Sequence, residues 1–186
     1  MIRAGVAALV GATLWASAGV AECRQALALG LDVSGSVDAR EYRLQLDGVA
    51  GALDDPAVRA AILSAPEAPV SLLVYEWSGP TDQRVIAPWR SISDAAALQE
   101  LIDGLRQVER AAASPGTALG VAVAAGAAYL AQRPACLKHT LDISGDGISN
   151  LGPRPRDVKR QLAGRDLTVN ALVAVSYTHL TLPTKA

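Results

Sequence analysis

Apolar runs alternate with amphipathic stretches along most of the chain. Four short segments contain apolar runs typical of strands buried on both faces of a sheet. They are the first half of residues 26–36 and the segments 70–77, 138–144 and 167–175. Between them, apolar residues recur at helical spacing in residues 42–53, 94–108, 118–132 and 156–163. Strands that alternate with helices in this way predict an α/β fold, with a parallel sheet covered on both faces.

One further strand departs from this alternation. Residues 83–89 follow the 70–77 run after the turn-forming segment 78–82, so we expect an antiparallel hairpin. Pro88 has no N–H group to donate to a neighbouring strand, which favours the edge of the sheet for this hairpin. The predicted fold is therefore a doubly wound, mostly parallel sheet of the Rossmann-like kind.

Cap residues mark two of the predicted helix starts. Asp38 precedes the first amphipathic pattern, and Glu41 stands three residues later, as in a capping box. Ser93 precedes the 94–108 pattern and is the expected N-cap there.

Composition narrows the class of protein. A chain of 186 residues predicts one domain, and a net charge of -1 provides no basic field to favour a nucleic-acid partner. Hydrophobic residues make up 51% of the chain, which is ample for a core, but there is no Phe. We therefore expect a core of Leu, Val, Ile and Ala, in which helices and strands approach closely.

The first 21 residues have the pattern of an export signal. Arg3 supplies a positive start, and residues 4–15 form a small-residue apolar stretch that is too short for a membrane span. Small residues before Ala18 and Ala21 suit signal peptidase, and we place cleavage after Ala21. The mature protein, without a membrane span, is then expected in the periplasm or outside the cell, where conditions are oxidising.

Cys23 and Cys136 are the two cysteines of the chain. An even number in an exported protein predicts a disulfide. Each cysteine lies just before a predicted strand, so both belong at the same end of the sheet if these strands are parallel neighbours. The alternative is a pair of free, buried thiols.

Candidate metal ligands lie where the first predicted strand ends. Asp32, Ser34 and Ser36 form an Asp-x-Ser-x-Ser motif, and Gly35 permits a tight turn between the two serines. Ligands bind at the carboxyl ends of the strands in open α/β sheets. One carboxylate and two hydroxyls suit a hard cation such as Mg²⁺, which prefers oxygen ligands and retains several waters. The alternative interpretation is a strand followed by a serine-rich turn.

Two more oxygen-bearing residues stand at comparable places. Thr117 directly precedes a predicted helix, and Asp146 lies in a Ser-Gly-Asp-Gly turn after a later predicted strand. With the Asp-x-Ser-x-Ser motif, they resemble the metal-ion-dependent adhesion site (MIDAS) of the von Willebrand factor type A (vWA) domain. The resemblance covers about residues 25–175. The segment LDISGDGISN and the signal segment are similar, more narrowly, to a family of exported bacterial vWA-like proteins of unknown function.

The resemblance implies a role for each of these residues. The hydroxyls of Ser34, Ser36 and Thr117 would coordinate a divalent cation, Mg²⁺ or Mn²⁺. Asp32 and Asp146 would bind it directly or through water and would supply negative charge. The remaining coordination position would take an acidic side chain of a partner protein.

Three neighbouring positions complicate this assignment. Gly145 stands where many vWA domains have threonine, although the following Asp is retained. Asp142 falls within a strand that should be buried, where a carboxylate is costly unless paired; it would support the ligands from behind or bind backbone amides. Asn150 would order the metal loop or cap its own turn, and the turn is the preferred interpretation.

The C-terminal sequence VSYTHLTLPTKA continues no helix or strand pattern and resembles a translated sequencing adapter. We expect residues 176–186 to be non-native and the vWA-like domain, residues 24–175, to lack its last strand and helix. The strand at 167–175 would then be an exposed apolar edge that invites aggregation, and we expect poor expression.

These patterns favour an exported, metal-dependent protein-binding or adhesion module without enzymatic activity. A metal-dependent phosphatase or phosphotransferase is the alternative, but the sequence has neither a P-loop nor a Gly-x-Ser-x-Gly elbow with a plausible His partner. A structural domain that binds no metal is the third hypothesis.

Overall fold

The computed structural model describes residues 23–145 and 148–173. The expected export signal, Asp146 and the segment 176–186 lie outside these residues. The elements are, in chain order, β1 (Gln25–Asp32), α1 (Ala39–Asp54), α2 (Pro56–Leu63), β2 (Val70–Trp77), β3 (Gln83–Ile92), α3 (Ala95–Gln107), α4 (Leu119–Leu130), β4 (His139–Gly145), α5 (Pro155–Leu162) and β5 (Thr168–Val173). No helix in this described part is long and apolar enough to cross a membrane.

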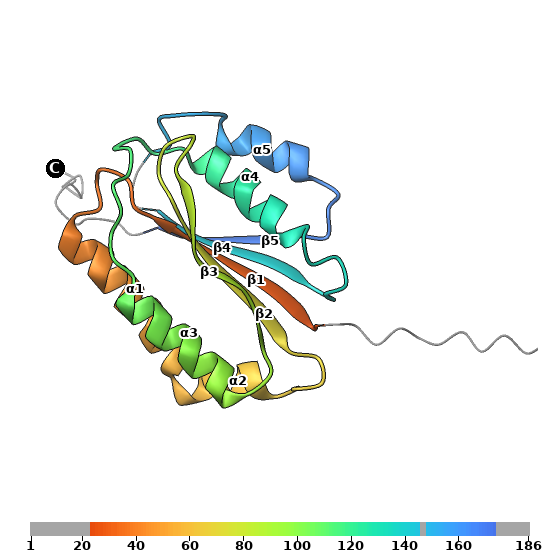
Figure 1. The fold of residues 1–186 in the computed structure, drawn as a ribbon. Helices are drawn as coiled ribbons and strands as arrows, with labels where there is room; N and C mark the ends of the chain where they lie inside the picture. The colour runs from red at the N-terminus through yellow and green to blue at the C-terminus, as the bar shows by residue number, and fades with distance from the viewer. Residues whose placement is uncertain (1–22, 146–147, 174–186) are drawn as a thin grey trace, which may run out of the picture.

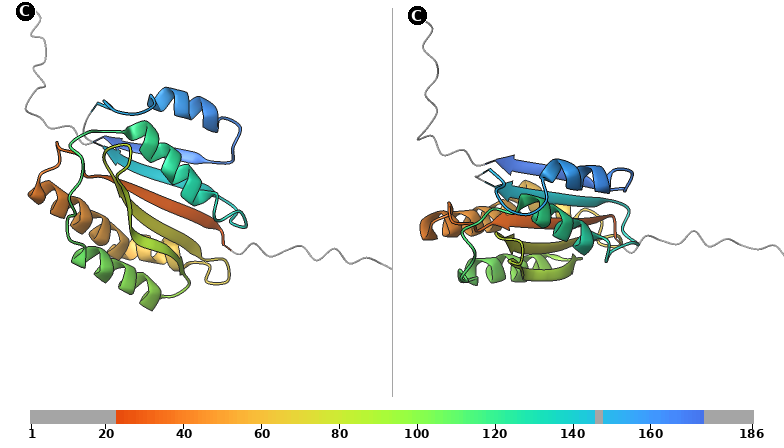
Figure 2. Two further views of the ribbon diagram at one scale, coloured as in Figure 1. Left: turned by 45° about the horizontal axis from the view of Figure 1, so that its top comes forward. Right: turned by 90° about the horizontal axis from the view of Figure 1, so that it is seen from above.

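The five strands of the described residues form one sheet in the order β3-β2-β1-β4-β5. β1 pairs in parallel with β2 and β4, and β4 pairs in parallel with β5. β3 is antiparallel to β2 and forms one edge. Helices α1, α2 and α3 cover one face of the sheet and α4 and α5 the other (Figures 1 and 2). The predicted α/β class, with its mostly parallel sheet and antiparallel edge hairpin, is confirmed.

The sheet separates two hydrophobic clusters. Leu27, Leu29 and Leu31 of β1 pack in the cluster with α1 and α3, whereas Ala26 and Ala28 pack in the cluster with α4. Because side chains alternate across a strand, β1 presents large residues to one helical layer and small ones to the other. Helix α4 can therefore lie close to the sheet, as the alanine-rich composition predicts.

Several boundaries differ from the sequence prediction. Strand β3 continues to Ile92, because Ile92 pairs with Val70 at the start of β2. The N-cap of α3 is Asp94, whose carboxylate accepts a hydrogen bond from the Ala97 N–H at 2.8 Å, so the assignment of Ser93 was wrong. The capping box of α1 formed by Asp38 is present as predicted.

Strand β5 is less buried than its apolar sequence predicts. Val169 is 42% exposed and Leu172 is 72% exposed. β5 pairs with β4 on one side only and is the outer strand of the described sheet. The apolar run alone, which is typical of a strand buried on both faces, was misleading here, whereas the exposed apolar edge also expected for this strand agrees with the described residues.

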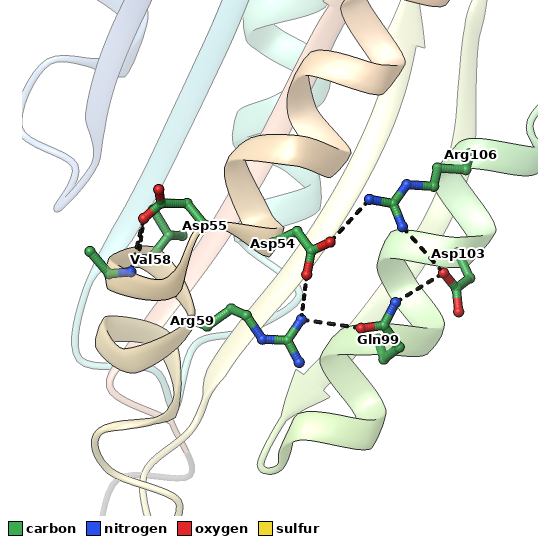
Figure 3. Close-up of polar contacts among 8 residues, drawn as sticks. Asp54, Asp55, Val58, Arg59, Gln99, Asp103 and Arg106 are labelled. Carbon is green, nitrogen blue, oxygen red and sulfur yellow. Dashed lines mark hydrogen bonds and ion pairs between the residues drawn. The ribbon is translucent and has the colours of Figure 1, made fainter.

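Ion pairs fix the packing of the three helices on the α1 face (Figure 3). Asp54, at the end of α1, accepts hydrogen bonds from Arg59 of α2 at 2.8 Å and from Arg106 of α3 at 3.1 Å. The hydrogen bond from Arg106 is the main cause that lowers the pKa of Asp54 below its ordinary value of 3.8. Gln99 extends this network by accepting from Arg59 and donating to Asp103.

A disulfide joins Cys23 to Cys136, with the Cα atoms 4.6 Å apart. The two residues form an isolated parallel bridge just before β1 and β4. The disulfide therefore lies at the end of the sheet opposite to the Asp-x-Ser-x-Ser motif.

Candidate metal centre

The Asp-x-Ser-x-Ser motif lies where β1 ends. Asp32 is the last residue of β1 and is 2% exposed, and Ser34 is fully buried. The N–H of Ser34 donates to the Asp32 carboxylate at 2.8 Å, which fixes the orientation of that side chain. The hydroxyls of Ser34 and Ser36 are 3.2 Å apart. The motif thus gathers a carboxylate and two hydroxyls within one turn, with Ser36 on the exposed side.

Thr117 lies just before α4 and is 6% exposed. Its N–H donates to the side-chain oxygen of Asn150 at 3.0 Å, and its carbonyl accepts from the N–H of Asn150 at 2.9 Å. Asn150 therefore orders the Thr117 segment and does more than cap its own turn, which was the preferred interpretation from the sequence. The side chain achieves this across 33 residues of sequence.

Backbone hydrogen bonds bring the two segments together. The N–H of Gly35, between the two serines, donates to the carbonyl of Pro115 at 3.1 Å. A Cβ on Gly35 would lie 2.9 Å from Pro115 Cβ, so this contact requires glycine. The N–H of Ala118 donates to the carbonyl of Ser78 at 2.8 Å, just after β2. The loops after β1 and β2 and the start of α4 therefore meet at the carboxyl end of these strands.

Asp142 has a side-chain partner that the sequence did not suggest. It is partly buried on β4, and its carboxylate accepts a hydrogen bond from the Asn170 side chain of β5 at 2.7 Å. The two side chains form a cross-strand pair, which the sequence could not indicate because the register of β4 against β5 was unknown.

Gln45 and Ser144 belong to the site and were missed in the sequence. Gln45, on α1, donates from Nε2 to the carbonyl of Asp32 at 3.0 Å and accepts at Oε1 from the Ser144 hydroxyl at 2.6 Å. Ser144 lies on β4, next to the strand's last residue, Gly145. A glutamine in an amphipathic helix carries no sequence pattern that distinguishes it from a solvated surface residue.

A buried polar network lies on the other side of the motif. Glu76 of β2 is 3% exposed, accepts from the Tyr42 hydroxyl at 2.6 Å and pairs with Arg84 of β3 at 2.8 Å. Burial, followed by the hydrogen bond to Glu76, raises the pKa of Tyr42. Arg84 also donates to the carbonyl of Glu109, in the loop that leads to Thr117. This network connects α1, the hairpin and that loop.

Hollows among the described residues adjoin the motif on two sides. A small one of about 220 Å³ lies beside Val33, between the hairpin turn and the loop that follows α3. A larger groove of about 830 Å³ runs between α1 and strands β1, β4 and β5, and its lining is mainly apolar. We call this the α1–β5 groove. Gln45 lies in its wall.

The donors of the motif fit a hard divalent cation. Six polar side chains are buried among the described residues, and Asp32, Ser34 and Thr117 are three of them. Their oxygens are of the kind that Mg²⁺ prefers, and none is a soft ligand. The described part of the chain holds no group of three or more His, Cys, Asp or Glu that could bind a metal, so hydroxyls would have to complete such a site.

Comparison with known protein families identifies the family of this chain. A family model described as a protein of unknown function (DUF1194) matches residues 22–182. The chain belongs to this family. No curated protein matches the chain.

Solved structures show what the fold is. A proximal thread matrix protein from the mussel byssus, with a zinc-occupied MIDAS motif, is 15% identical with a TM-score of 0.63, and the match covers 83% of this chain and 39% of that one. A von Willebrand factor type A structure from Catenulispora acidiphila is 16% identical with a TM-score of 0.58, over 81% and 33% of the two chains. A pilus adhesin of Lactobacillus rhamnosus GG is 16% identical with a TM-score of 0.51, over 68% and 16%.

This DUF1194 chain thus has the vWA fold. It spans about two fifths of the length of the mussel protein, and less of the other two. Identities this low establish the architecture alone, so the roles of individual residues depend on the geometry above.

Proposed function

We propose that this DUF1194 protein is an exported, divalent-metal-dependent protein-binding module without enzymatic activity. The observation that carries the proposal is the buried cluster of Asp32 and Ser34, joined through Gly35 to the segment that contains Thr117. A carboxyl group and hydroxyls gathered at the carboxyl end of a central strand are the oxygen ligands that a hard divalent cation takes.

The proposed ligands are the hydroxyls of Ser34, Ser36 and Thr117, with Asp32 and Asp146 as the carboxylates. Mg²⁺ is the preferred cation and Mn²⁺ its substitute, since both take oxygen ligands. The zinc-occupied MIDAS motif of the mussel protein supports a divalent cation on this fold. When bound, the cation would offer a coordination position to an acidic side chain of a partner protein.

Export is the second part of the proposal. The disulfide between Cys23 and Cys136 supports it, because such bonds persist in oxidising compartments such as the periplasm or the exterior of the cell. The relationship in fold to a pilus adhesin is consistent with a role outside the cytosol.

Thermal unfolding with EDTA, Mg²⁺, Mn²⁺ or Ca²⁺ tests the metal site. A cation that binds only the folded state stabilises it by about 2.7 kcal/mol when present at about 100 times its Kd. For a domain of this size, that corresponds to a rise in Tm of about 5–10 °C. We expect the rise with Mg²⁺ or Mn²⁺ in the wild type, its loss in Thr117→Ala, and its recovery in Thr117→Ser.

Thr140→Ala is the matched control, because Thr140 lies on β4 and its hydroxyl accepts a hydrogen bond from Gln25, away from the motif. Its Tm should rise with metal as in the wild type. The absence of any shift at millimolar metal would overturn the proposal. A shift that survives in Thr117→Ala would place the cation elsewhere and would contradict the assigned ligands.

Partner recognition has its own test. A carboxylate that enters the coordination position displaces a water from Mn²⁺ and lowers the water-proton relaxation rate. We expect a short aspartyl peptide to have this effect on the Mn²⁺-loaded protein and its asparaginyl counterpart to have none. Equal effects of the two peptides would refute recognition through an acidic side chain.

A further inference from the structure

One side chain connects three elements at the candidate metal centre. Gln45 donates to the carbonyl of Asp32 at the end of β1, and it accepts from the hydroxyl of Ser144 near the end of β4. The Ser144 hydroxyl also lies 3.4 Å from the N–H of Asp32 and from the carbonyl of Gly30. Gln45 therefore fixes helix α1 against the two strands that lead into the metal loops.

Gln45 lies where the wall of the α1–β5 groove changes character. Leu44, Gly48, Val49 and Ala52 of α1 are apolar or small, whereas Glu41 and the strand residues Asp32 and Ser144 are polar. A partly buried amide loses hydration unless its hydrogen bonds are made. Both polar atoms of the Gln45 amide make such bonds, and both bonds go to the strand ends beside the motif.

The connection reaches a proposed ligand through the backbone. Asp32 bears the carboxylate that the Ser34 N–H orients, and its own carbonyl is the acceptor for Gln45. Ser144 is followed by Gly145 and then by Asp146. A residue that fixes both strand ends sets how Asp32 lies relative to the end of β4 before a cation arrives.

We propose that Gln45 is a positioning residue for the metal site, acting with Ser144 to hold the ends of β1 and β4. The inference rests on the metal site proposed above and extends it to residues that are not ligands. Without the Gln45 bonds, the ends of β1 and β4 must be ordered in the binding step, and cation affinity falls. Residues that orient the ligands of a metal typically affect its affinity by about 10- to 100-fold.

The decisive variant is Gln45→Met. Methionine has nearly the same length and helix propensity as glutamine, fits an apolar wall and makes neither hydrogen bond. We expect the Kd for Mn²⁺, measured by electron paramagnetic resonance of the free ion, to rise about tenfold. The Tm in EDTA should fall about as much as that of Gln99→Met, which also loses two side-chain hydrogen bonds, so a loss of affinity beyond that control separates positioning from a general loss of stability.

Gln99→Met is the matched control. Gln99 also lies on a helix, accepts one side-chain hydrogen bond and donates another, but it belongs to the ion-pair network between α2 and α3 (Figure 3). Its Kd for Mn²⁺ should equal that of the wild type.

Ser144 provides the second half of the test. Ser144→Ala should weaken Mn²⁺ binding, and Ser144→Thr should restore it because the hydroxyl returns. Both changes break one network, so their effects on the Kd should not multiply. We expect the double variant with Gln45→Met to raise the Kd for Mn²⁺ by less than the product of the two single increases.

The outcomes separate this inference from the proposed function. If the wild type binds Mn²⁺, Thr117→Ala does not, and Gln45→Met binds like the wild type, the positioning role is refuted and the metal site stands. If Gln45→Met and Gln99→Met weaken binding equally, the effect is a general loss of stability and the inference fails. If the wild type binds no Mn²⁺, the proposed function and this inference both fail.

Discussion

Gly120→Ala, which adds one methyl group, tests the contact between α4 and the loop that contains Pro153. Gly120 is buried near the start of α4, and a Cβ built on it would lie 2.1 Å from the carbonyl oxygen of Pro153. The overlap is with backbone, so a rotamer change cannot relieve it. Gly120→Ala must therefore push the loop and the helix apart.

Two opposing terms set the size of the effect. Alanine is favoured over glycine within a helix by up to about 1 kcal/mol. Overpacking of a tightly packed site costs about 1–3 kcal/mol. We expect Gly120→Ala to destabilise the protein by about 1–2 kcal/mol, which lowers the Tm by about 2–8 °C for a domain of this size.

Gly104→Ala on α3 is the matched control. No atom lies within 4 Å of a Cβ built on Gly104, so only the helix term remains, and we expect stabilisation by about 0.5–1 kcal/mol. Thermal and urea unfolding in EDTA measure both variants. A Gly120→Ala variant that is as stable as Gly104→Ala would refute the packing of the loop on α4.

The same variant bears on the metal site. Pro153 follows Asn150 and Leu151, whose N–H groups both donate to the carbonyl of Thr117. A displaced loop strains these bonds, so we expect Gly120→Ala also to weaken Mn²⁺ binding, whereas Gly104→Ala should leave the Kd unchanged.

Three further predictions concern the scaffold. Loss of the Cys23–Cys136 disulfide, which closes a loop with a sequence separation of 113 residues, should cost about 4–5 kcal/mol in the chain-entropy model, measured by urea unfolding of the double serine variant. Tyr42→Phe removes a donor from buried Glu76 and should lower the free energy of unfolding by about 1–3 kcal/mol, again in urea. The hydrogen bond from Arg106 lowers the pKa of Asp54 below 3.8 in the folded state. The stability that ionised Asp54 contributes is therefore complete above its ordinary pKa and is lost as the pH falls through the lower, folded-state pKa. The urea midpoint of the wild type should therefore fall more steeply below about pH 4 than that of Asp54→Asn.

Patterns that reflect burial predicted most of the architecture. The central strand β1 and its parallel neighbour β4 are fully or partly buried along their length, and their apolar runs indicate this directly. The Pro88 argument placed the hairpin at an edge, because a missing N–H is a property of the residue itself. Asp38 and Glu41 specify their capping box locally, within four residues.

Features that depend on register or on competition between similar residues were beyond the sequence. Ser93 and Asp94 are both good caps, and only the backbone decides which one occupies the N-cap. The partner of Asp142 is Asn170, which becomes its neighbour only when β5 is paired with β4. The exposure of Leu172 likewise depends on what covers β5 and not on its own identity.

The two amide side chains at the candidate centre, Asn150 and Gln45, differ in whether a carboxylate could make the same hydrogen bonds. Asn150 uses its side-chain oxygen as an acceptor for the Thr117 N–H, and an aspartate could accept that bond equally well. Gln45 must donate to the Asp32 carbonyl and accept from Ser144, and an ionised glutamate can only accept. A carboxylate at position 45 would face the carbonyl oxygen of Asp32 and repel it. If α1 positions the metal loops as inferred, the amide of Gln45 is therefore the part of this network that a charged residue cannot replace.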